Sequence, residues 1–325
     1  MVDVVCLRPE EDFEKVGVSA PGTLSSCYIS PKDENLESHL ANARALLIPA
    51  VGPFLPGGLF EESRIKFVQV TGAGVDRVDA DTMKRLGIAV SNVPGGSSSA
   101  IAEYAVSSAL VLLRRLIWAS AELCSGRYVE ARQQMVADNL AGLEGLTVGV
   151  IGLGVIGLNV ARAFHAMGSR IVYCDAVSRD PAVTDPIAAQ ALSLTELLHC
   201  ADIVTLHVPL LADTEAMIGE RELARMKPGA ILINASRGKI VDEGALARRL
   251  ATGQIGGAAV DVYAEEPPGE DNPLLCLAGD VQHRLLLTPH IAGVTRQAWA
   301  FLFRSAWENI ERVLVDGEPP NNRVI

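Results

Sequence analysis

Residues 147–168, TVGVIGLGVIGLNVARAFHAMG, decide the fold of this chain. They begin with a short apolar run, continue through three glycines in G-x-G-x-x-G spacing, and end in a stretch with helical apolar periodicity. The next run, RIVYCD at residues 170–175, predicts a second strand that ends in an acidic residue. This strand–loop–helix–strand order is typical of a dinucleotide-binding βαβ unit, and it predicts a parallel α/β sheet.

Each part of this stretch has a physical task. Gly152 would make the tight turn, Gly154 would let the backbone approach a pyrophosphate, and Gly157 would let the helix pack closely on the strand. Asp175 would accept hydrogen bonds from the adenosine ribose and repel a 2′-phosphate, which favours NAD over NADP. Arg179 lies close enough in the sequence to weaken that preference. The alternative interpretation is a glycine-rich turn that binds nothing.

The rest of the chain alternates strand-like runs with helical stretches, which predicts a parallel α/β architecture throughout. Glycine- and serine-rich residues 94–104 (PGGSSSAIAEY) and the stretch Pro289–Gly293 predict crossings between two domains, and residues 295–316 predict a final helix. We expect residues 1–98 and 291–325 to form one domain, with a dinucleotide-binding domain of residues 99–290 inserted between them.

The composition narrows the class of protein. A formal net charge of −11 over 325 residues argues against nucleic acid or an anionic membrane as the main partner. The six cysteines are scattered without metal-ligand spacing, which predicts free thiols in a reducing compartment and no metal site. The amino terminus lacks signal-peptide features, and the apolar residues 100–123 are interrupted by Glu103, Arg114 and Arg115. We therefore expect a cytoplasmic protein in which residues 100–123 form a buried interdomain or interface helix.

Three charged residues follow successive strand-like runs of the second domain: Arg237 after ILINAS, Glu266 in DVYAEEPP and His290 in LLLTPHIAG. Beside a nicotinamide, His290 can donate the proton that a reduced carbonyl needs, and a carboxylate on its other ring nitrogen favours the imidazolium. Arg237 can clamp a substrate carboxylate through two hydrogen bonds, which lysine does poorly. The alternatives are a structural histidine, a solvated acidic turn at Glu265 and Glu266, and an arginine that pairs with a helix end or with Asp242.

Seven motifs occur in an order that resembles the D-2-hydroxyacid dehydrogenase family, especially its phosphoglycerate dehydrogenase-like members. They are TGAGVDRVD, SNVPGGSSSAIAEY, GLGVIG, LHVPL, MKPGAILINASRGKIVDEGAL, AAVDVYAEEPP and TPHIAG, and they span nearly the whole chain. The resemblance implies two Rossmann-like domains with parallel sheets, a flavodoxin-like substrate domain and a NAD-binding domain, with the active site in the cleft between them. It also implies a homodimer, joined largely through the cofactor domain, that transfers hydride between NADH and the C2 carbonyl of a small 2-oxo acid.

The resemblance assigns roles to individual residues. It implies Arg237 as the substrate clamp, Glu266 as the partner of the histidine, and His290 as the acid/base. Backbone groups at Gly72, Ala73 and Gly74 would grip the substrate carboxylate. Besides Gly152, Gly154, Gly157 and Asp175, the implied cofactor-binding positions are Val155, Ile156, His207, Val208, Pro209, Ala235, Ser236, Arg237, Asp261, His290 and Gly293.

The substrate is less closely defined than the reaction. Phosphoglycerate-using relatives carry an arginine after the strand that corresponds to ALLIP, whereas this chain has no cation there until Arg64. A phosphorylated substrate is therefore disfavoured, although Arg77 leaves room for one. Phe54 and Leu55 either line an apolar substrate pocket or cap the core of the first domain, and Trp299 either reaches the cleft or packs.

Three other functions fit the same motifs. One is phosphoglycerate dehydrogenase proper. Another is a formate or phosphite dehydrogenase, although formate enzymes usually pair the histidine with glutamine, and Glu266 argues against that. The last is a NAD(H)-sensing binding protein similar to the corepressors of this superfamily, which the absence of a basic surface disfavours.

Overall fold

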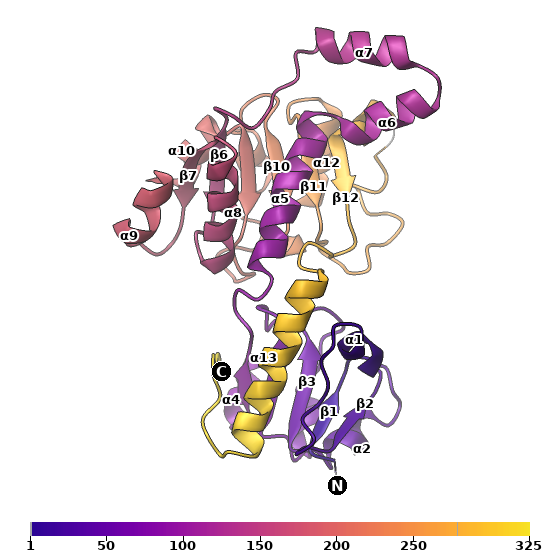
Figure 1. Ribbon diagram of the computed structural model, residues 1–325, viewed down its shortest axis with the longest axis vertical. Coiled ribbons are helices and arrows are strands. Elements are labelled where there is room, and N and C mark those ends of the chain that lie inside the picture. Colours follow the sequence, from indigo (N-terminus) through magenta and orange to yellow (C-terminus); the bar gives the residue numbers. More distant parts are fainter. Residues whose placement is uncertain (1, 278) are drawn as a thin grey trace. The chain divides into compact units, whose positions relative to one another are not determined.

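The computed structural model describes residues 2–277 and 279–325, which form two compact units (Figure 1). Unit 1 comprises Met1–Ser97 and Val294–Ile325, and unit 2 comprises Ser98–Gly293. Each unit is built on one parallel sheet, of five strands in unit 1 and seven in unit 2, within the described residues. This confirms the predicted α/β architecture. The chain crosses between the units after Ser97 and after Gly293, where the sequence placed the crossings after residues 98 and 290.

Unit 1 has the strand order β2-β1-β3-β4-β5, with every pairing parallel. This is the flavodoxin-like order, in which helices cover both faces. Its strands are β1 (Val4–Cys6), β2 (Ser26–Tyr28), β3 (Ala45–Pro49), β4 (Phe67–Thr71) and β5 (Ala89–Ser91), and its helices are α1 (Glu10–Glu14), α2 (Leu36–Leu40), α3 (Gly58–Glu61), α4 (Ala80–Leu86) and α13 (Arg296–Leu314).

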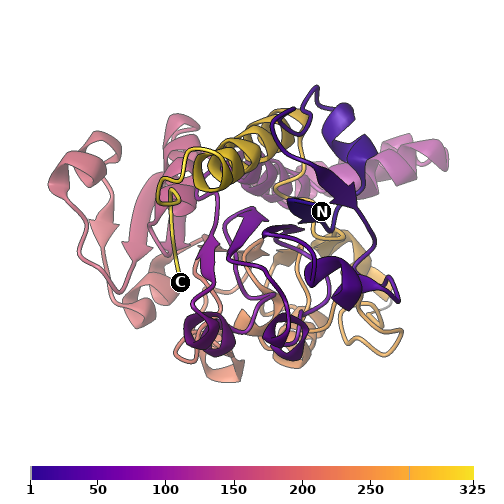
Figure 2. The same ribbon diagram turned by 90° about the horizontal axis from the view of Figure 1, so that it is seen from below.

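The two faces of this sheet bury different residues because side chains alternate along a strand. On one face, Leu46 and Val68 pack with the short helices α2 to α4, and on the other Leu47 and Phe67 pack with α1 and α13. Helix α13 returns to unit 1 from the end of the chain and lies along one face of the sheet (Figure 2). The final helix that the sequence predicted over residues 295–316 is thus present, with Thr295 as its N-cap.

Unit 2 has the strand order β12-β11-β10-β9-β6-β7-β8, again with parallel pairings throughout. The order reverses between β6 and β9, which is the switch point where doubly wound sheets bind ligands. Its strands are β6 (Thr147–Ile151), β7 (Arg170–Cys174), β8 (Gln190–Ala191), β9 (Ile203–Leu206), β10 (Ile231–Asn234), β11 (Gly257–Val260) and β12 (Leu285–Leu287). Its α-helices are α5 (Ser98–Leu113), α6 (Leu116–Cys124), α7 (Tyr128–Ala137), α8 (Val155–Ala166), α9 (Pro181–Thr184), α10 (Leu194–Cys200), α11 (Glu220–Leu223) and α12 (Glu243–Ala251), with 3₁₀ turns at Asp185–Ile187, Gly238–Ile240 and Gly279–Arg284.

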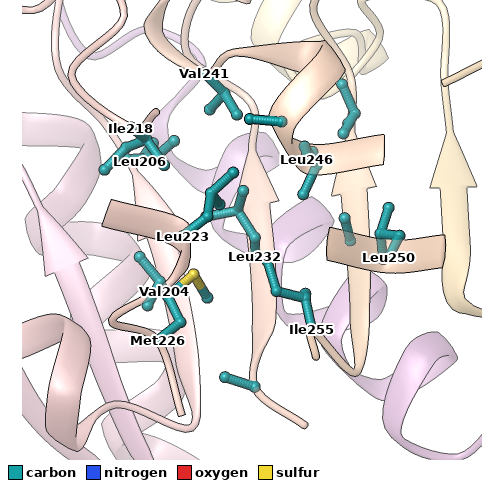
Figure 3. Packing of buried hydrophobic residues seen from close by; sticks show 14 of the residues in the cluster. Val204, Leu206, Ile218, Leu223, Met226, Leu232, Val241, Leu246, Leu250 and Ile255 are labelled. Carbon is teal, nitrogen blue, oxygen red and sulfur yellow. The ribbon is translucent and has the colours of Figure 1, made fainter. Parts of the chain in front are cut away.

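A hydrophobic core supports the strand ends of unit 2. Leu232 of β10 is fully buried between Leu246 and Leu250 of α12 on one side and Val204 of β9 and Met226 on the other (Figure 3). The opposite face of the sheet is covered by α5 and α8 (Figure 1). The turn that follows β10 therefore starts from strands that are packed on both sides.

The long helix expected over residues 100–123 is instead two helices. The first, α5, is buried against α8 and the sheet and ends at Leu113. Arg115 then adopts a left-handed backbone with φ of 47°, and α6 begins at Leu116 with none of its residues buried. The prediction of one continuous helix was therefore wrong at Arg115, and α6 is not buried within this chain, while an interface role for it stays a prediction. Over the described residues, no helix has both the length and the apolar character needed to cross a membrane.

Candidate active site

The glycine loop follows β6 at the switch point of unit 2. Gly152 has φ of 90°, which favours glycine, and a Cβ there would also lie within 2.6 Å of the His207 carbonyl oxygen. A Cβ on Gly157 would overlap the carbonyl oxygen of Gly152, whereas a Cβ on Gly154 would meet nothing within 4 Å. Gly154 borders open space, and no side chain caps the start of α8. Both features fit a pyrophosphate that accepts hydrogen bonds from backbone N–H groups.

Asp175 follows β7 and contacts the glycine loop through the Leu153 N–H. Its Oδ2 accepts hydrogen bonds from the Leu153 N–H at 2.6 Å and from Arg179 Nη2 at 2.6 Å, and its Oδ1 accepts from the Val177 N–H at 2.8 Å. Burial alone would raise the pKa of Asp175, but Arg179 and the two backbone N–H groups outweigh it and lower the pKa. The carboxylate is thus ionised, and it is already paired within the chain.

The turn after β9 lies against the glycine loop. The His207 N–H donates to the Ile151 carbonyl at 2.8 Å, and its ring Nε2 lies 2.8 Å from Thr205 Oγ1. Desolvation of the ring lowers the pKa of His207 to about 3. His207 is therefore neutral at physiological pH.

Glu266 and His290 form a direct pair in unit 2. His290 Nδ1 lies 2.8 Å from Glu266 Oε2, and Glu266 Oε1 accepts from the Tyr263 N–H at 3.0 Å. Burial would raise the pKa of Glu266, but the hydrogen bonds from His290 and Tyr263, and the charges of His290 and Arg237, lower it overall. The carboxylate is therefore ionised and orients the ring through Nδ1, which leaves Nε2 for a reacting group.

The loop that carries His290 is held by a buried aspartate. Asp261 has no exposed surface, and its carboxylate accepts from Thr288 Oγ1 at 2.6 Å and from the N–H groups of Ile291 and Ala292 at 2.8 Å each. Burial raises the pKa of Asp261 in spite of these bonds. His290 itself has φ of 55°, so these contacts stabilise a left-handed backbone at the acid/base candidate.

Arg237 occupies the turn between β10 and α12. Asn234, the last residue of β10, donates from Nδ2 to the Arg237 carbonyl at 3.0 Å and accepts from Ser236 Oγ at 2.8 Å. The half-buried guanidinium donates from Nη1 to the Ser236 carbonyl at 2.8 Å. A Cβ on Gly238 would overlap the backbone of Tyr263, so this turn lies directly against the loop of Glu266.

The structure thus brings Arg237, Glu266 and His290 to the carboxyl ends of β10, β11 and β12 in one unit. Tyr104 was not predicted as a site residue, yet its hydroxyl lies 2.7 Å from Thr288 Oγ1 and extends the Asp261 network. Thr288 was not predicted either, although a hydroxyl residue two positions before the histidine could have indicated it.

The predicted substrate loop belongs to unit 1, where Gly72, Ala73 and Gly74 follow β4. The Gly72 carbonyl accepts from the Val93 N–H at 2.9 Å, and the Ala73 carbonyl accepts from Asn92 Nδ2 at 2.7 Å. Both contacts fix the loop without using its N–H groups. Binding of a substrate carboxylate by these N–H groups stays a prediction.

Other candidates in unit 1 have structural partners. Arg77 is only 3% exposed and donates to the carbonyls of Pro49 at 2.8 Å and Pro53 at 2.9 Å. Leu55 is buried in the core, whereas Phe54 is 57% exposed. Trp299 packs against Phe303 and the guanidinium of Arg8, with the Arg8 Cζ 4.3 Å from its ring.

Comparison with known proteins defines the class. Residues 106–292 match the family described as D-isomer specific 2-hydroxyacid dehydrogenase, NAD binding domain. The chain is 35% identical over 296 residues to a glyoxylate reductase from Aeropyrum pernix, covering 90% of this chain and 87% of that protein. It is 37% identical over 235 residues to a D-3-phosphoglycerate dehydrogenase from Archaeoglobus fulgidus, covering 72% of this chain but only 42% of that protein.

Solved structures agree with these relatives. A D-lactate dehydrogenase from Aquifex aeolicus, in complex with NAD and lactic acid, superposes with a TM-score of 0.84 and 26% identity, and the match covers 99% of this chain and 98% of the other. The chain belongs to the D-isomer specific 2-hydroxyacid dehydrogenase family. It is an oxidoreductase that acts on CH–OH groups and carries a nicotinamide-dinucleotide-binding domain.

Proposed function

We propose that the protein reduces the C2 carbonyl of a small 2-oxo acid to the D-2-hydroxy acid, with NADH as the preferred reductant. The observation that carries this proposal is the 2.8 Å pair of His290 and Glu266 next to the turn of Arg237, in the unit that has the dinucleotide loop. When bound, the nicotinamide would supply or accept the hydride.

The residues of the chain would supply the rest of the chemistry. Glu266 holds Nδ1 of His290, so the proton at Nε2 is the one available to a developing alkoxide. The Glu266 carboxylate also stabilises the charged form of the ring through this hydrogen bond. Arg237 would bind the substrate carboxylate through its planar fork and polarise the adjacent carbonyl.

The experiment that tests this function is oxidation of NADH by the purified protein with a panel of 2-oxo acids. The panel should contain glyoxylate, hydroxypyruvate, phosphohydroxypyruvate, and branched and aromatic members. Turnover of at least one member supports the proposal. Binding of NADH without turnover of any member would contradict it and favour the sensing role.

Two observations favour an unphosphorylated substrate. The side chain of Arg77 is only 3% exposed and donates to two backbone carbonyls of unit 1, so little of its guanidinium is accessible to a phosphate. The exposed Phe54 beyond β3 adds apolar surface rather than charge. We therefore place glyoxylate, hydroxypyruvate or an apolar 2-oxo acid ahead of phosphohydroxypyruvate, and the same panel distinguishes them.

The cofactor preference depends on Asp175 and Arg179. An ionised Asp175 favours the ribose hydroxyls of NAD, but Arg179 neutralises much of its charge and offers a partner to a 2′-phosphate. We propose a preference for NADH with measurable use of NADPH.

Replacing Arg179 with alanine is expected to lower the ratio of kcat/KM for NADPH to that for NADH by about tenfold or more. The physical reason is that the 2′-phosphate loses a charge-assisted hydrogen bond while Asp175 regains its full repulsion. Steady-state kinetics with both reductants measures the ratio. Arg248→Ala is the control, because Arg248 is also paired with a carboxylate, that of Glu220, and should leave the ratio unchanged. A ratio that Arg179→Ala leaves at the wild-type value would contradict this role.

We also propose a homodimer in a reducing, cytoplasmic compartment. All six cysteines are free thiols. Helices α6 and α7 carry several large apolar side chains that are each about half or more exposed. Monomeric soluble proteins rarely expose so many together. These side chains are Leu116, Ile117, Leu123, Tyr128, Val129 and Val136.

Light scattering of the purified protein is expected to give about twice the chain mass of 34.5 kDa. Burial of an apolar helix pair against a second copy would stabilise the association. Replacing Ile117 and Val136 with lysine should shift the mass towards that of one chain. A wild-type protein of single-chain mass at micromolar concentration would contradict the proposal.

A further inference from the structure

Glu243 makes contacts that its place in the helix does not require. It is the first residue of α12, whose N-cap is Asp242, and Asp242 already accepts the Ala245 N–H at 2.8 Å. The carboxylate of Glu243 instead reaches a different loop. Its Oε1 accepts from the Ala264 N–H at 2.7 Å, and its Oε2 accepts from Asn272 Nδ2 at 2.7 Å.

That loop carries Glu266. The N–H of Ala264 bonds to Glu243, while the N–H of the preceding Tyr263 bonds to Oε1 of Glu266. The other oxygen of Glu266 lies 2.8 Å from His290 Nδ1. The turn of residues 263–266 is therefore held on one side by α12 and on the other by the carboxylate that contacts the histidine.

The same turn has no room to move towards Arg237. A Cβ on Gly238 would overlap the backbone of both Tyr263 and Ala264, so the two turns are already in backbone contact. Loss of the Glu243 contacts would thus let residues 263–266 move away from β10. Movement in that direction changes the distance between the Glu266 carboxylate and His290 Nδ1.

We propose that Glu243 is a positioning residue, which fixes the 263–266 turn so that Glu266 stays within hydrogen-bond distance of His290. This inference rests on the role of the Glu266–His290 pair in the proposed function, and it adds a residue that touches neither reactant. Among the described residues, the charged and titratable groups around the pair include Asp261, Arg237 and Tyr263, besides the two members themselves. Glu243 acts on it through the backbone.

The test is the titration of the His290 ring, followed by NMR in ¹³C-histidine-labelled protein without cofactor or substrate. The variant His290→Asn identifies the signal. Glu243→Ala is expected to move the midpoint towards acid by about one pH unit, because a weaker hydrogen bond from the Glu266 carboxylate stabilises the imidazolium less. Since no turnover is needed, this result is independent of whether any 2-oxo acid is a substrate.

Glu243→Gln separates position from charge. Its amide oxygen can still accept from the Ala264 N–H, but its amide nitrogen cannot accept from Asn272 Nδ2, so the midpoint should move by less than in Glu243→Ala and by about as much as in Asn272→Ala. A shift equal to that of Glu243→Ala would mean that the charge acts directly, which overturns the proposal. An unshifted midpoint in Glu243→Ala would overturn it as well.

Glu196→Ala is the matched control. Glu196 lies at the start of α10, and in the described part of the chain its carboxylate bonds to Ser193 within its own capping box, so its loss should destabilise a helix start without moving the midpoint. A shift in this control as large as in Glu243→Ala would also count against the proposal. If Glu243→Ala does not fold, Asn272→Ala, which releases the second contact, should move the midpoint in the same direction by less, and no movement would overturn the proposal.

Kinetics gives a second readout for any 2-oxo acid that is turned over. In Glu243→Ala the alkaline limb of the kcat/KM profile for reduction, which reports groups of the enzyme before it binds the 2-oxo acid, should move to lower pH in the same direction as the NMR midpoint. The KM for NADH should stay at the wild-type value, because Glu243 is at the start of α12 and not at the glycine loop. A raised KM with an unmoved kcat/KM profile would indicate a merely structural residue.

Discussion

Replacement of His290 with asparagine is expected to lower kcat for 2-oxo acid reduction by about 10²–10⁴-fold, the usual contribution of a positioned general acid. Asparagine is chosen because it tolerates the left-handed backbone that His290 adopts, with φ of 55°. The alkoxide that develops at C2 would then have to take its proton from water. Stopped-flow or steady-state measurement of NADH oxidation gives the rate.

The controls separate chemistry from folding. Binding of NADH, measured by fluorescence, should be within about twofold of wild type, since the glycine loop is untouched. His165→Asn, on the exposed surface of α8, should leave kcat unchanged. Wild-type turnover in His290→Asn would refute the acid role.

Replacement of Arg237 with alanine is expected to lower kcat/KM for the 2-oxo acid by about 10³-fold. The fork would lose two charge-assisted hydrogen bonds to the substrate carboxylate, each worth about 1.5–3 kcal/mol. Arg237→Lys should recover only part of the loss, because an ammonium keeps the charge but not the planar pair of donors. Initial rates over a range of 2-oxo acid concentrations measure the change.

Lys239→Ala is the control for simple loss of positive charge. Lys239 is exposed two residues further along the same turn, so kcat/KM should change by less than about twofold. An equal fall in both variants would point to long-range attraction of the anionic substrate instead of a clamp. Unchanged kcat/KM in Arg237→Ala would mean that the arginine has a structural role only.

Much of the architecture was predictable because its signals are local. The glycine spacing at residues 152–157 and the acidic end of β7 reflect steric and electrostatic needs that act within a few residues. Charged residues that follow buried strands were also visible, since the carboxyl ends of parallel strands meet at one edge. The sequence therefore predicted which side chains gather in unit 2.

Contacts between segments that are distant in the sequence could not be predicted. Glu265 and Glu266 are adjacent residues of the same type, so the sequence does not distinguish them. The fold of the 263–266 turn decides that Glu266 contacts His290. The burial of Asp261 and its three partners in the loop of residues 288–292 depends on two strands that are adjacent in space. The break at Arg115 falls at the two arginines that interrupt the apolar run, but the residue pattern alone did not show that the helix ends there.

The left-handed backbone at residue 290 limits which substitutions this position can accept. Branched side chains are disfavoured in that conformation, whereas asparagine and aspartate adopt it readily, and each is one base change from either histidine codon. A substitution that removes the general acid and still fits the backbone at residue 290 therefore needs only one base change. A nucleotide-binding descendant that has lost catalysis would therefore lie a single mutation away from this enzyme.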